Sequence, residues 1–326
     1  MTETPTNIAA APETSLLADV LSRVRLTGAL FLKGEYGAPW ALESPASHDL
    51  MAMLAPGAER LIVFHVVTEG RMWVDAEGTR VELRAGDMGI LPAAHRHAMG
   101  SLLPCAPRPI GELLPPAPWP DIPTCRLDGG GEPTRVVCGY FRCDEPLFNG
   151  LLRQLPPVFG VRPGGPTLDW MMATVGYALH RGAQPGEDAL TARLPELLLV
   201  EALRLHAEQS ARPDGWLAAI RDPVVGRALA LLHRDPGHSW TVPELARLAA
   251  TSRSVLGERF AQLLGISPMQ YLAGWRMQIA ADLLRTTRLK MHEIAERSGY
   301  GSEVAFSRAF SRHLGVAPGA LRRAQD

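Results

Sequence analysis

The sequence predicts two domains. The first is an all-β barrel or double-sheet jelly roll followed by helices, and the second is all-α, with two helix-turn-helix units joined by a linker helix. Three observations predict this: strand signals over residues 25–143, helical periodicity after Asp144, and a helix-turn-helix pattern that occurs twice near the carboxyl end. The 326 residues, 46% of them apolar, are enough to give each domain a core.

We expect the domains to be bounded as follows. A polar, disordered tail covers 1–14, the first domain covers 15–210 (a barrel to about residue 144, then helices over 145–210), a linker covers 211–222, and the second domain covers 223–323. The sequence has no apolar run of about twenty residues, the length needed to span a membrane. Four irregularly placed cysteines indicate a reducing compartment, which we expect to be the cytoplasm.

The strands of the first domain are predicted by Val-, Ile- and Phe-rich runs that end at turn residues. These runs cover 60–67, 71–75, 80–83 and 88–91, with turns at 69–70, 77–78 and 86–87. A later strand is expected within 129–144. The segment 104–123 contains eight prolines in twenty residues and is expected to be a loop.

Helical periodicity predicts three helices at the end of the first domain, over 146–155, 167–180 and 188–207. The last has a broad apolar face, which is formed by Leu190, Leu194, Leu197, Leu198, Ala202 and Leu205. This face either packs on the barrel of its own chain or forms a dimer interface. The residue pattern leaves both alternatives open.

The second domain contains one pattern twice, over 241–272 and 290–321. Leu256, Phe260, Gly265 and Pro268 recur 50 residues later as Phe306, Phe310, Gly315 and Pro318. Two short amphipathic helices joined by a tight turn are typical of a helix-turn-helix unit. Two copies predict a chain that contacts DNA at two places.

The second helix of each copy has recognisable ends. We expect Thr251 or Ser252 to cap the first copy and Ser302 the second, and Gly265 and Gly315 to end the helices in left-handed turns. The residues expected to face inward are Val255, Leu256, Phe260 and Leu263 in the first copy and Val304 or Ala305, Phe306, Phe310 and Leu314 in the second.

The two units are joined by an apolar segment, 268–285, in which Gly274 is the only helix breaker. As a helix it is about 27 Å long, which suits recognition helices placed in major-groove turns about 34 Å apart. From Trp216 to Asp326 there are 15 Lys and Arg against 9 Asp and Glu, whereas residues 1–215 have 18 against 25. The basic excess of the second domain fits contact with phosphates.

Over 223–323 the sequence resembles the DNA-binding domain of AraC/XylS-family transcription regulators. The resemblance covers both units, the linker residues 276–280 and the closing segment 299–323. It implies that the second helices read bases, through Arg253, Ser254, Gly257 and Glu258 in the first unit and Ser302, Glu303, Ser307 and Arg308 in the second. Arg312, Arg322 and Arg323 are expected to contact phosphates.

Glu258 departs from the family pattern, because a basic residue is common at its position. It either accepts a hydrogen bond from a cytosine amine or pairs with Arg253 or Arg259.

The first domain resembles a cupin. Gly86, Pro92 and His97 have the spacing of the second cupin motif, G-x5-P-x4-H. The first motif is degraded, because no H-x-H pair followed by a glutamate precedes Gly70. Cupin domains commonly precede the AraC-type module, so the resemblance implies a domain that senses an effector and supports dimerisation.

His65, His97 and Cys138 are the residues of the first domain that we expect to carry chemistry. A closed barrel brings their strands together, and two imidazoles with a thiolate suit zinc or another divalent metal. His95 is a fourth candidate, since two residues that are two apart on a strand face the same side. The alternative is a set of hydrogen-bonded core histidines beside an inert buried cysteine.

The cysteines Cys105, Cys125, Cys138 and Cys143 are also candidates for sensing oxidants. Cys138 and Cys143 are about 16 Å apart on one strand, too far apart for a disulfide. A disulfide between Cys138 and either Cys105 or Cys125 stays open, because those two lie on or near the proline-rich loop.

These patterns together predict a cytoplasmic, homodimeric transcription regulator, more often an activator in the family it resembles. Its expected partners are double-stranded promoter DNA, RNA polymerase and an effector that is a small molecule, a metal or an oxidant, with no membrane. The alternative is a metal-dependent cupin enzyme fused to a DNA-binding domain. The missing carboxylate and histidine of the usual cupin ligand set argue against this enzyme.

Overall fold

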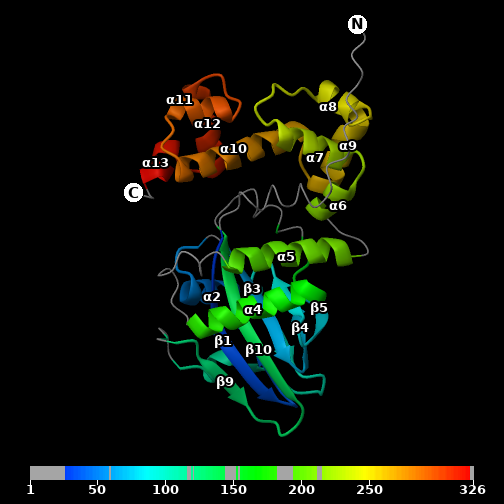
Figure 1. The fold of residues 1–326 in the computed structure, drawn as a ribbon, viewed down its shortest axis with the longest axis vertical. Helices are drawn as coiled ribbons and strands as arrows, with labels where there is room; N and C mark the ends of the chain where they lie inside the picture. The colour runs from blue at the N-terminus through cyan, green and yellow to red at the C-terminus, as the bar shows by residue number, and fades with distance from the viewer. Residues whose placement is uncertain are drawn as a thin grey trace. The chain divides into compact units, whose positions relative to one another are not determined.

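The computed structural model describes residues 26–58, 60–115, 119, 121–143, 152, 155–181, 194–210 and 215–323. The chain divides into two compact units, one containing 25–144 and 148–211 and the other containing 212–326. The first unit is built from strands and covering helices, and the second is helical (Figure 1). This confirms the predicted fold class. The predicted tail and most of the predicted helix over 146–155 lie outside the described residues.

The strands of the first unit form two sheets. The six-stranded sheet has the order β11-β6-β3-β10-β1-β9, and the five-stranded sheet has the order β5-β4-β7-β2-β8. The strands are β1 Leu26–Gly37, β2 Ala41–Glu43, β3 Leu61–Glu69, β4 Arg71–Ala76, β5 Thr79–Arg84, β6 Met88–Leu91, β7 His97–Gly100, β8 Arg108–Pro109, β9 Thr124–Leu127, β10 Pro133–Cys143 and β11 Phe159–Val161. Antiparallel pairing of β3 with β10 and with β6 forms the centre of the larger sheet.

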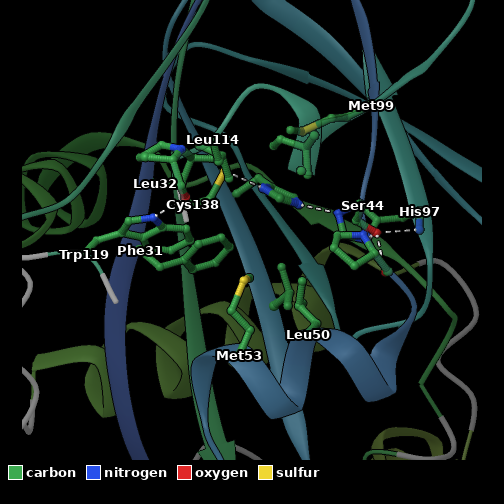
Figure 2. A pocket seen from close by; sticks show the side chains of 16 residues that line it. Phe31, Leu32, Ser44, Leu50, Met53, His97, Met99, Leu114, Trp119 and Cys138 are labelled. Atoms are coloured by element: carbon green, nitrogen blue, oxygen red, sulfur yellow. Dashed lines mark hydrogen bonds between the residues drawn. The ribbon is translucent and has the colours of Figure 1, made fainter. Parts of the chain in front are cut away.

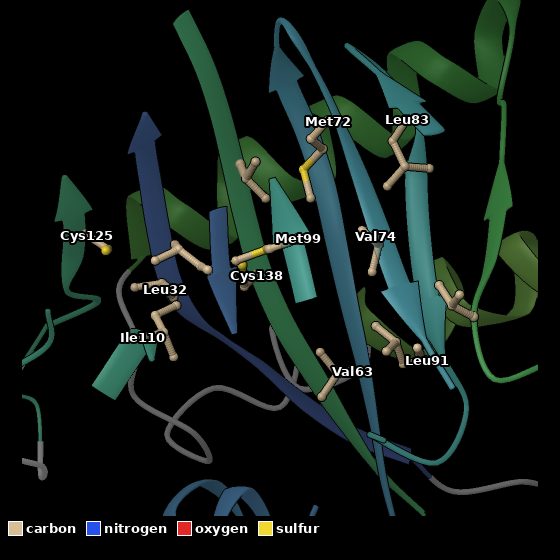
Figure 3. Close-up of a cluster of buried hydrophobic side chains, with 14 of the residues drawn as sticks. Leu32, Val63, Met72, Val74, Leu83, Leu91, Met99, Ile110, Cys125 and Cys138 are labelled. Atoms are coloured by element: carbon tan, nitrogen blue, oxygen red, sulfur yellow. The ribbon is translucent and has the colours of Figure 1, made fainter. Parts of the chain in front are cut away.

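The core of this unit lies between the two sheets. Val63 and Cys138 from the larger sheet meet Met72, Val74 and Met99 from the smaller one (Figure 3). The other face of β3 and β10 is covered as well, because the buried rings of Phe64 and Phe141 stack there with centroids 4.7 Å apart. Burial on both faces explains why these strands are continuous apolar runs instead of alternating ones.

Three helices accompany the sheets: α2 (Ser47–Leu54), α4 (Gly165–Arg181) and α5 (Leu194–Gln209). Helix α5 contacts β1 and β11, and it buries Leu198, Leu199, Ala202, Leu203 and Leu205. Of the two alternatives for its apolar face, packing on the barrel of its own chain is therefore observed. The first part of the predicted helix over 188–207 lies outside the described residues.

The second unit consists of eight helices among the described residues. They are α6 Gly215–Arg221, α7 Val225–Arg234, α8 Val242–Leu248, α9 Arg253–Leu264, α10 Pro268–Thr286, α11 Met291–Arg297, α12 Glu303–Leu314 and α13 Pro318–Arg323. Helix α6 corrects the predicted linker over 211–222. Its residues Trp216, Leu217 and Ile220 are buried, since helical spacing places them on one face that packs on α7 and α9.

The two helix-turn-helix units, α8–α9 and α11–α12, have the predicted ends. The side chains of Ser252 and Ser302 cap α9 and α12, and Gly265 and Gly315 end these helices in the left-handed conformation, with φ of 69° and 72°. Helix α10 joins the units over 19 residues. In the second helix-turn-helix unit, Phe306 and Phe310 pack with residues of α10 and α11 in one buried cluster. None of the described helices is long and apolar enough to cross a membrane.

Candidate functional site

Helices α9 and α12 present the residues expected to read DNA. Each helix is held by its buried side, through Leu256 and Phe260 in α9 and through Phe306 and Phe310 in α12. The predicted base-reading and phosphate residues that are exposed are Arg253, Ser254, Glu258, Ser302, Glu303, Arg308, Arg312 and Arg323, and those of intermediate exposure are Gly257, Ser307 and Arg322. Arg322 and Arg323 lie on α13, and the others are accessible on α9, on α12 or at the cap of α12. Their contacts with DNA stay a prediction.

Three of the polar residues in this unit already have partners within the chain. The hydroxyl of Ser302 accepts a hydrogen bond from the amide of Ala305 at 3.2 Å, so its proton and one acceptor lone pair remain for a base or phosphate. Arg322 donates to the carbonyl of Leu289 at 2.7 Å, which limits its predicted role on a phosphate. Arg259 pairs with Asp222 and not with Glu258, contrary to one of the alternatives for Glu258.

The sequence reasoning missed two apolar residues on the same accessible sides. Val255, which was expected to be buried, is 39% exposed, and Val304, expected to be buried as an alternative to Ala305, is 61% exposed; Ala305 is exposed as well. Both valines lie in the first turn of their helices, beyond the reach of the cluster that holds each helix. A helix turns about 100° per residue, so Val304 lies about 200° from Phe306. Helical spacing was thus the signal that identifies Val304 as outward-facing.

Arg276, on α10, lies between the two helix-turn-helix units. Its guanidinium donates to the carbonyls of Pro236 and His238, at 2.7 and 2.8 Å, in the loop before α8. It also lies 6.0 Å from the ring centroid of Tyr300, in the turn between α11 and α12. A Cβ on Gly299 would lie only 2.8 Å from the guanidinium. Arg276 is thus positioned to fix the two recognition helices relative to one another.

The first unit contains a cavity of about 290 Å³. It is lined from α2, from strands of both sheets and from the loop after β8 (Figure 2). The lining residues are Phe31, Leu32, Ser44, Pro45, Leu50, Met53, Val63, His65, His97, Met99, Ile110, Gly111, Leu114, Pro115, Trp119 and Cys138. The three residues expected to carry chemistry therefore meet at one cavity.

These three residues form a hydrogen-bonded line across the barrel, which we call the imidazole relay. Cys138 on β10 and His65 on β3 are register partners in the larger sheet, and the Cys138 Sγ lies 3.0 Å from the His65 Nδ1. The His65 Nε2 lies 3.0 Å from the Nε2 of His97, which belongs to the smaller sheet. The His97 Nδ1 lies 2.8 Å from the carbonyl oxygen of His95. The relay thus connects the two sheets.

The direction of these hydrogen bonds follows from the last one. A carbonyl only accepts, so the His97 Nδ1 carries the proton and its Nε2 accepts from the His65 Nε2–H. The His65 Nδ1 then accepts from the thiol of Cys138. Both rings must be neutral for this, and burial lowers the pKa of His97 to about 4 and that of His65 well below its usual value. Burial raises the pKa of the Cys138 thiol, which keeps its proton.

This arrangement does not fit the predicted three-ligand metal centre. In this arrangement Cys138 and His97 contact opposite nitrogens of His65, so the three donors do not converge on one point. No group of three or more His, Cys, Asp or Glu suited to a metal occurs among the described residues. His95 is also misplaced in the prediction: β7 begins at His97, and the His95 Nδ1 pairs with Glu77 at 2.9 Å. The same-face rule does not apply there, because it holds within a strand and residues 95 and 96 precede β7.

The cysteines are separated in the structure. Cys105 is exposed, and Cys125 and Cys138 are buried free thiols. Cys125 belongs to strand β9 and not to a loop, and β1 lies between β9 and β10. Two strand spacings are about 10 Å, beyond the reach of a disulfide, so the alternative that pairs Cys138 with Cys125 is not favoured. The side chain of Cys143 lies outside the described part of the chain.

Comparisons with known proteins agree with both units. Residues 15–208 match the cupin family, and residues 245–324 match a helix-turn-helix domain family. A Streptomyces antibioticus protein described as an AraC-like transcription regulator is 37% identical over 82% of this chain and 88% of its own length. A Streptomyces lividans protein with the same description is 34% identical over 94% of this chain and 97% of its own length.

A solved structure of the DNA-binding domain of AdpA, a global transcriptional factor, in complex with a target DNA is 35% identical to this chain. It covers 32% of this chain and 92% of its own, with a TM-score of 0.30. The similarity to the two Streptomyces regulators extends over both units, and it favours the regulator over the fused enzyme. The chain therefore belongs to the AraC-like transcription regulators with an amino-terminal cupin domain, and it is a DNA-binding regulator and not an enzyme.

Proposed function

We propose that this regulator is controlled by a small molecule that enters the cavity of the cupin domain and changes the binding of the chain to promoter DNA. The cavity is the observation that carries the proposal. Protein interiors are close-packed and contain few voids larger than a water molecule. A space of about 290 Å³ bordered by a hydrogen-bonded polar relay fits a ligand site better than a packing defect.

Control requires that the ligand bind one state of the protein more tightly than another. We propose that the two states differ in whether both helix-turn-helix units reach their half-sites. The relay spans the two sheets, so a ligand that moves one sheet against the other changes the hydrogen bonds of His65 and His97. A ligand in the cavity thereby changes how the two sheets of the cupin domain pack.

The homodimer is expected to form through helix α4. Its inner side is buried through Met171 and Val175, whereas Trp170 and Tyr177 are 37% and 45% exposed. Exposed Ala173 lies between these two rings along the helix. In an antiparallel pair of such helices, Trp170 of one protomer meets Tyr177 of the other across small residues, so the surface is complementary to itself.

The dimer is tested by sedimentation of the full chain. A Trp170→Glu, Tyr177→Glu double variant is expected to be monomeric at concentrations where the unmodified chain is dimeric. Leu197→Glu is the matched control, since Leu197 is 50% exposed on α5, and it is expected to stay dimeric. Dissociation by Leu197→Glu alone would place the interface on α5 instead.

The remaining expectations rest on the family. We propose that the regulator works in the cytoplasm on double-stranded promoter DNA and activates transcription together with RNA polymerase. In vitro transcription from a promoter that the chain protects is expected to rise when the chain is added to purified polymerase. A fall in transcript on the same template would show repression.

Zinc, another divalent metal or an oxidant is the alternative to a small-molecule effector. Because Cys138 and His97 contact opposite sides of His65, protein purified without chelators is expected to have the same metal content as its Cys138→Ser variant. Stoichiometric metal that disappears in this variant would establish Cys138 as a ligand and contradict the relay.

The proposed function is tested by measuring the affinity of the full chain for DNA with and without an organic extract from a culture of the organism that produces the protein. The extract is expected to change the affinity for a selected DNA site at least tenfold. Met53→Trp, at the cavity on α2, is expected to abolish this response, whereas His48→Trp on the same helix is expected to keep it. A response that survives Met53→Trp would place the sensor elsewhere.

A further inference from the structure

Among the residues that the structure describes, none with a formally charged side chain lines the cavity. Of the 16 described residues that line it, five have side chains with a hydrogen-bonding group: Ser44, His65, His97, Trp119 and Cys138. None of the 16 is Asp, Glu, Lys or Arg. An ionised ligand would therefore give up its hydration without gaining a partner of opposite charge, which is strongly unfavourable in a buried site.

The polar groups of the wall are already hydrogen-bonded to one another. Cys138, His65 and His97 form the relay, which ends on a backbone carbonyl. The Ser44 hydroxyl accepts from the His97 amide at 3.0 Å and donates to the carbonyl of Pro45 at 3.2 Å. The Trp119 indole donates to the carbonyl of Pro115 at 2.8 Å. None of the buried polar side-chain atoms that lack a partner in the described chain belongs to a lining residue.

The relay also holds both imidazoles in the neutral form near pH 7, because burial lowers the pKa of His97 to about 4 and that of His65 well below its usual value. Neither ring then offers a positive charge to a carboxylate or phosphate. The relay therefore presents to the cavity only uncharged groups that already have hydrogen-bond partners, and the rest of the wall is mostly apolar.

The size of the cavity and its edge limit the ligand further. About 290 Å³ is the volume of roughly ten water-sized groups. Met53 and Leu50 reach the cavity from α2 (Figure 2), and Met53 is 38% exposed, so it lies at the edge where the cavity approaches solvent. A flexible methionine adapts to apolar ligands of different shape.

We infer that the effector is a small, uncharged and predominantly apolar molecule, such as a medium-chain alcohol or a compact aromatic compound. This inference rests on the proposed function, since it assigns a chemical class to the ligand of the same cavity. It excludes sugars, which need many hydrogen-bonding partners, and it excludes carboxylates, phosphates and amines that are ionised near pH 7.

The test uses the full chain and the uncharged fluorescent probe N-phenyl-1-naphthylamine. The probe is expected to bind, and 1-octanol, octanoate and octylammonium, below their aggregation limits, are then compared as competitors. These three share a chain length and differ in charge. We expect 1-octanol to displace the probe at a concentration at least tenfold lower than either ion.

Two variants on α2 locate the probe. Met53→Trp fills the edge of the cavity and is expected to weaken probe binding at least tenfold. His48→Trp places the same side chain at a position whose side chain is 91% exposed, and it is expected to bind the probe as the unmodified chain does. Circular dichroism checks that both variants are folded.

Several results overturn the inference: no probe binding, probe binding that Met53→Trp leaves unchanged, or an ion that competes as well as 1-octanol. Measuring DNA affinity with the same compounds separates this inference from the proposed function. Binding of 1-octanol in the cavity without any effect on DNA affinity would contradict control through the cavity and leave the ligand class standing. A DNA response to octanoate or octylammonium alone, lost in Met53→Trp, would leave that control standing and overturn the class.

Discussion

Acid is expected to destabilise the cupin domain because the relay needs neutral imidazoles. Burial lowers the pKa of His97 to about 4 in the folded protein, whereas an unfolded histidine has a pKa of about 6.5. Below about pH 6.5 the unfolded state therefore binds a proton that the folded state does not. The stabilisation from a neutral His97 is complete above that pH and is lost as the pH falls toward 4.

The size of the effect follows from the difference between the two pKa values. One pKa unit corresponds to about 1.4 kcal/mol, so the full effect of His97 is about 3 kcal/mol, and about 2 kcal/mol is lost between pH 7 and pH 5. His65 acts in the same direction, since its pKa is also lowered by burial and by His97. A loss of this size is a large fraction of the stability of a typical domain.

The assay is urea unfolding of the full chain at pH 7, 6 and 5 with a chelator present. Hydrogen exchange of peptides from β3 and β10 reports the cupin domain separately from the DNA-binding unit. His97→Gln is expected to be less stable at every pH, but its loss between pH 7 and pH 5 is expected to be smaller by about 2 kcal/mol. His48→Gln, at an exposed position, is the control and is expected to keep the full pH dependence. If His97→Gln kept it too, the buried neutral relay would be refuted.

Three further predictions concern the DNA-binding unit. Arg276→Ala removes two hydrogen bonds from a charged group and is expected to weaken binding to a two-half-site DNA about tenfold, with little change on a single half-site; equal losses on both would contradict its positioning role. Replacing thymines by uracil in the selected site is expected to weaken binding up to about fourfold per methyl contacted, and Val304→Ser is expected to be less sensitive; equal sensitivity would exclude a methyl contact by Val304. Phe310→Ala, at a fully buried position, is expected to lower the stability of this unit by about 3–5 kcal/mol in thermal unfolding, and a loss below about 1 kcal/mol would contradict the described core.

The helix-turn-helix units were predictable because their signals are local. Capping serines and left-handed glycines act within a few residues of the helix they end, and α9 and α12 begin and end within a residue of the positions that these signals indicate. Strand β1 was not assigned because Gly28, Gly34 and Gly37 resemble turn residues. It is a strand because it pairs with β10 and β9, which follow it by many residues.

The meeting of His65, His97 and Cys138 was predictable for a related reason, since all three lie on strands of the two sheets that enclose the core. Which imidazole nitrogen faces which neighbour was not predictable, because that depends on how the two sheets are placed against each other. The same limit explains His95, whose position depends on where β7 begins. Residue spacing thus identified the members of the site, and the packing of the sheets decides what they do together.

The most direct test of the regulator assignment is a hydroxyl-radical footprint of the full chain on a DNA site recovered by selection from random sequence. Two recognition helices joined by α10 are expected to protect two segments about 34 Å apart on one face of the duplex, and Arg308→Ala is expected to lose protection of one segment first. A single protected segment, or two protected segments whose protection does not depend on their sequences, would contradict sequence-specific binding by both helix-turn-helix units.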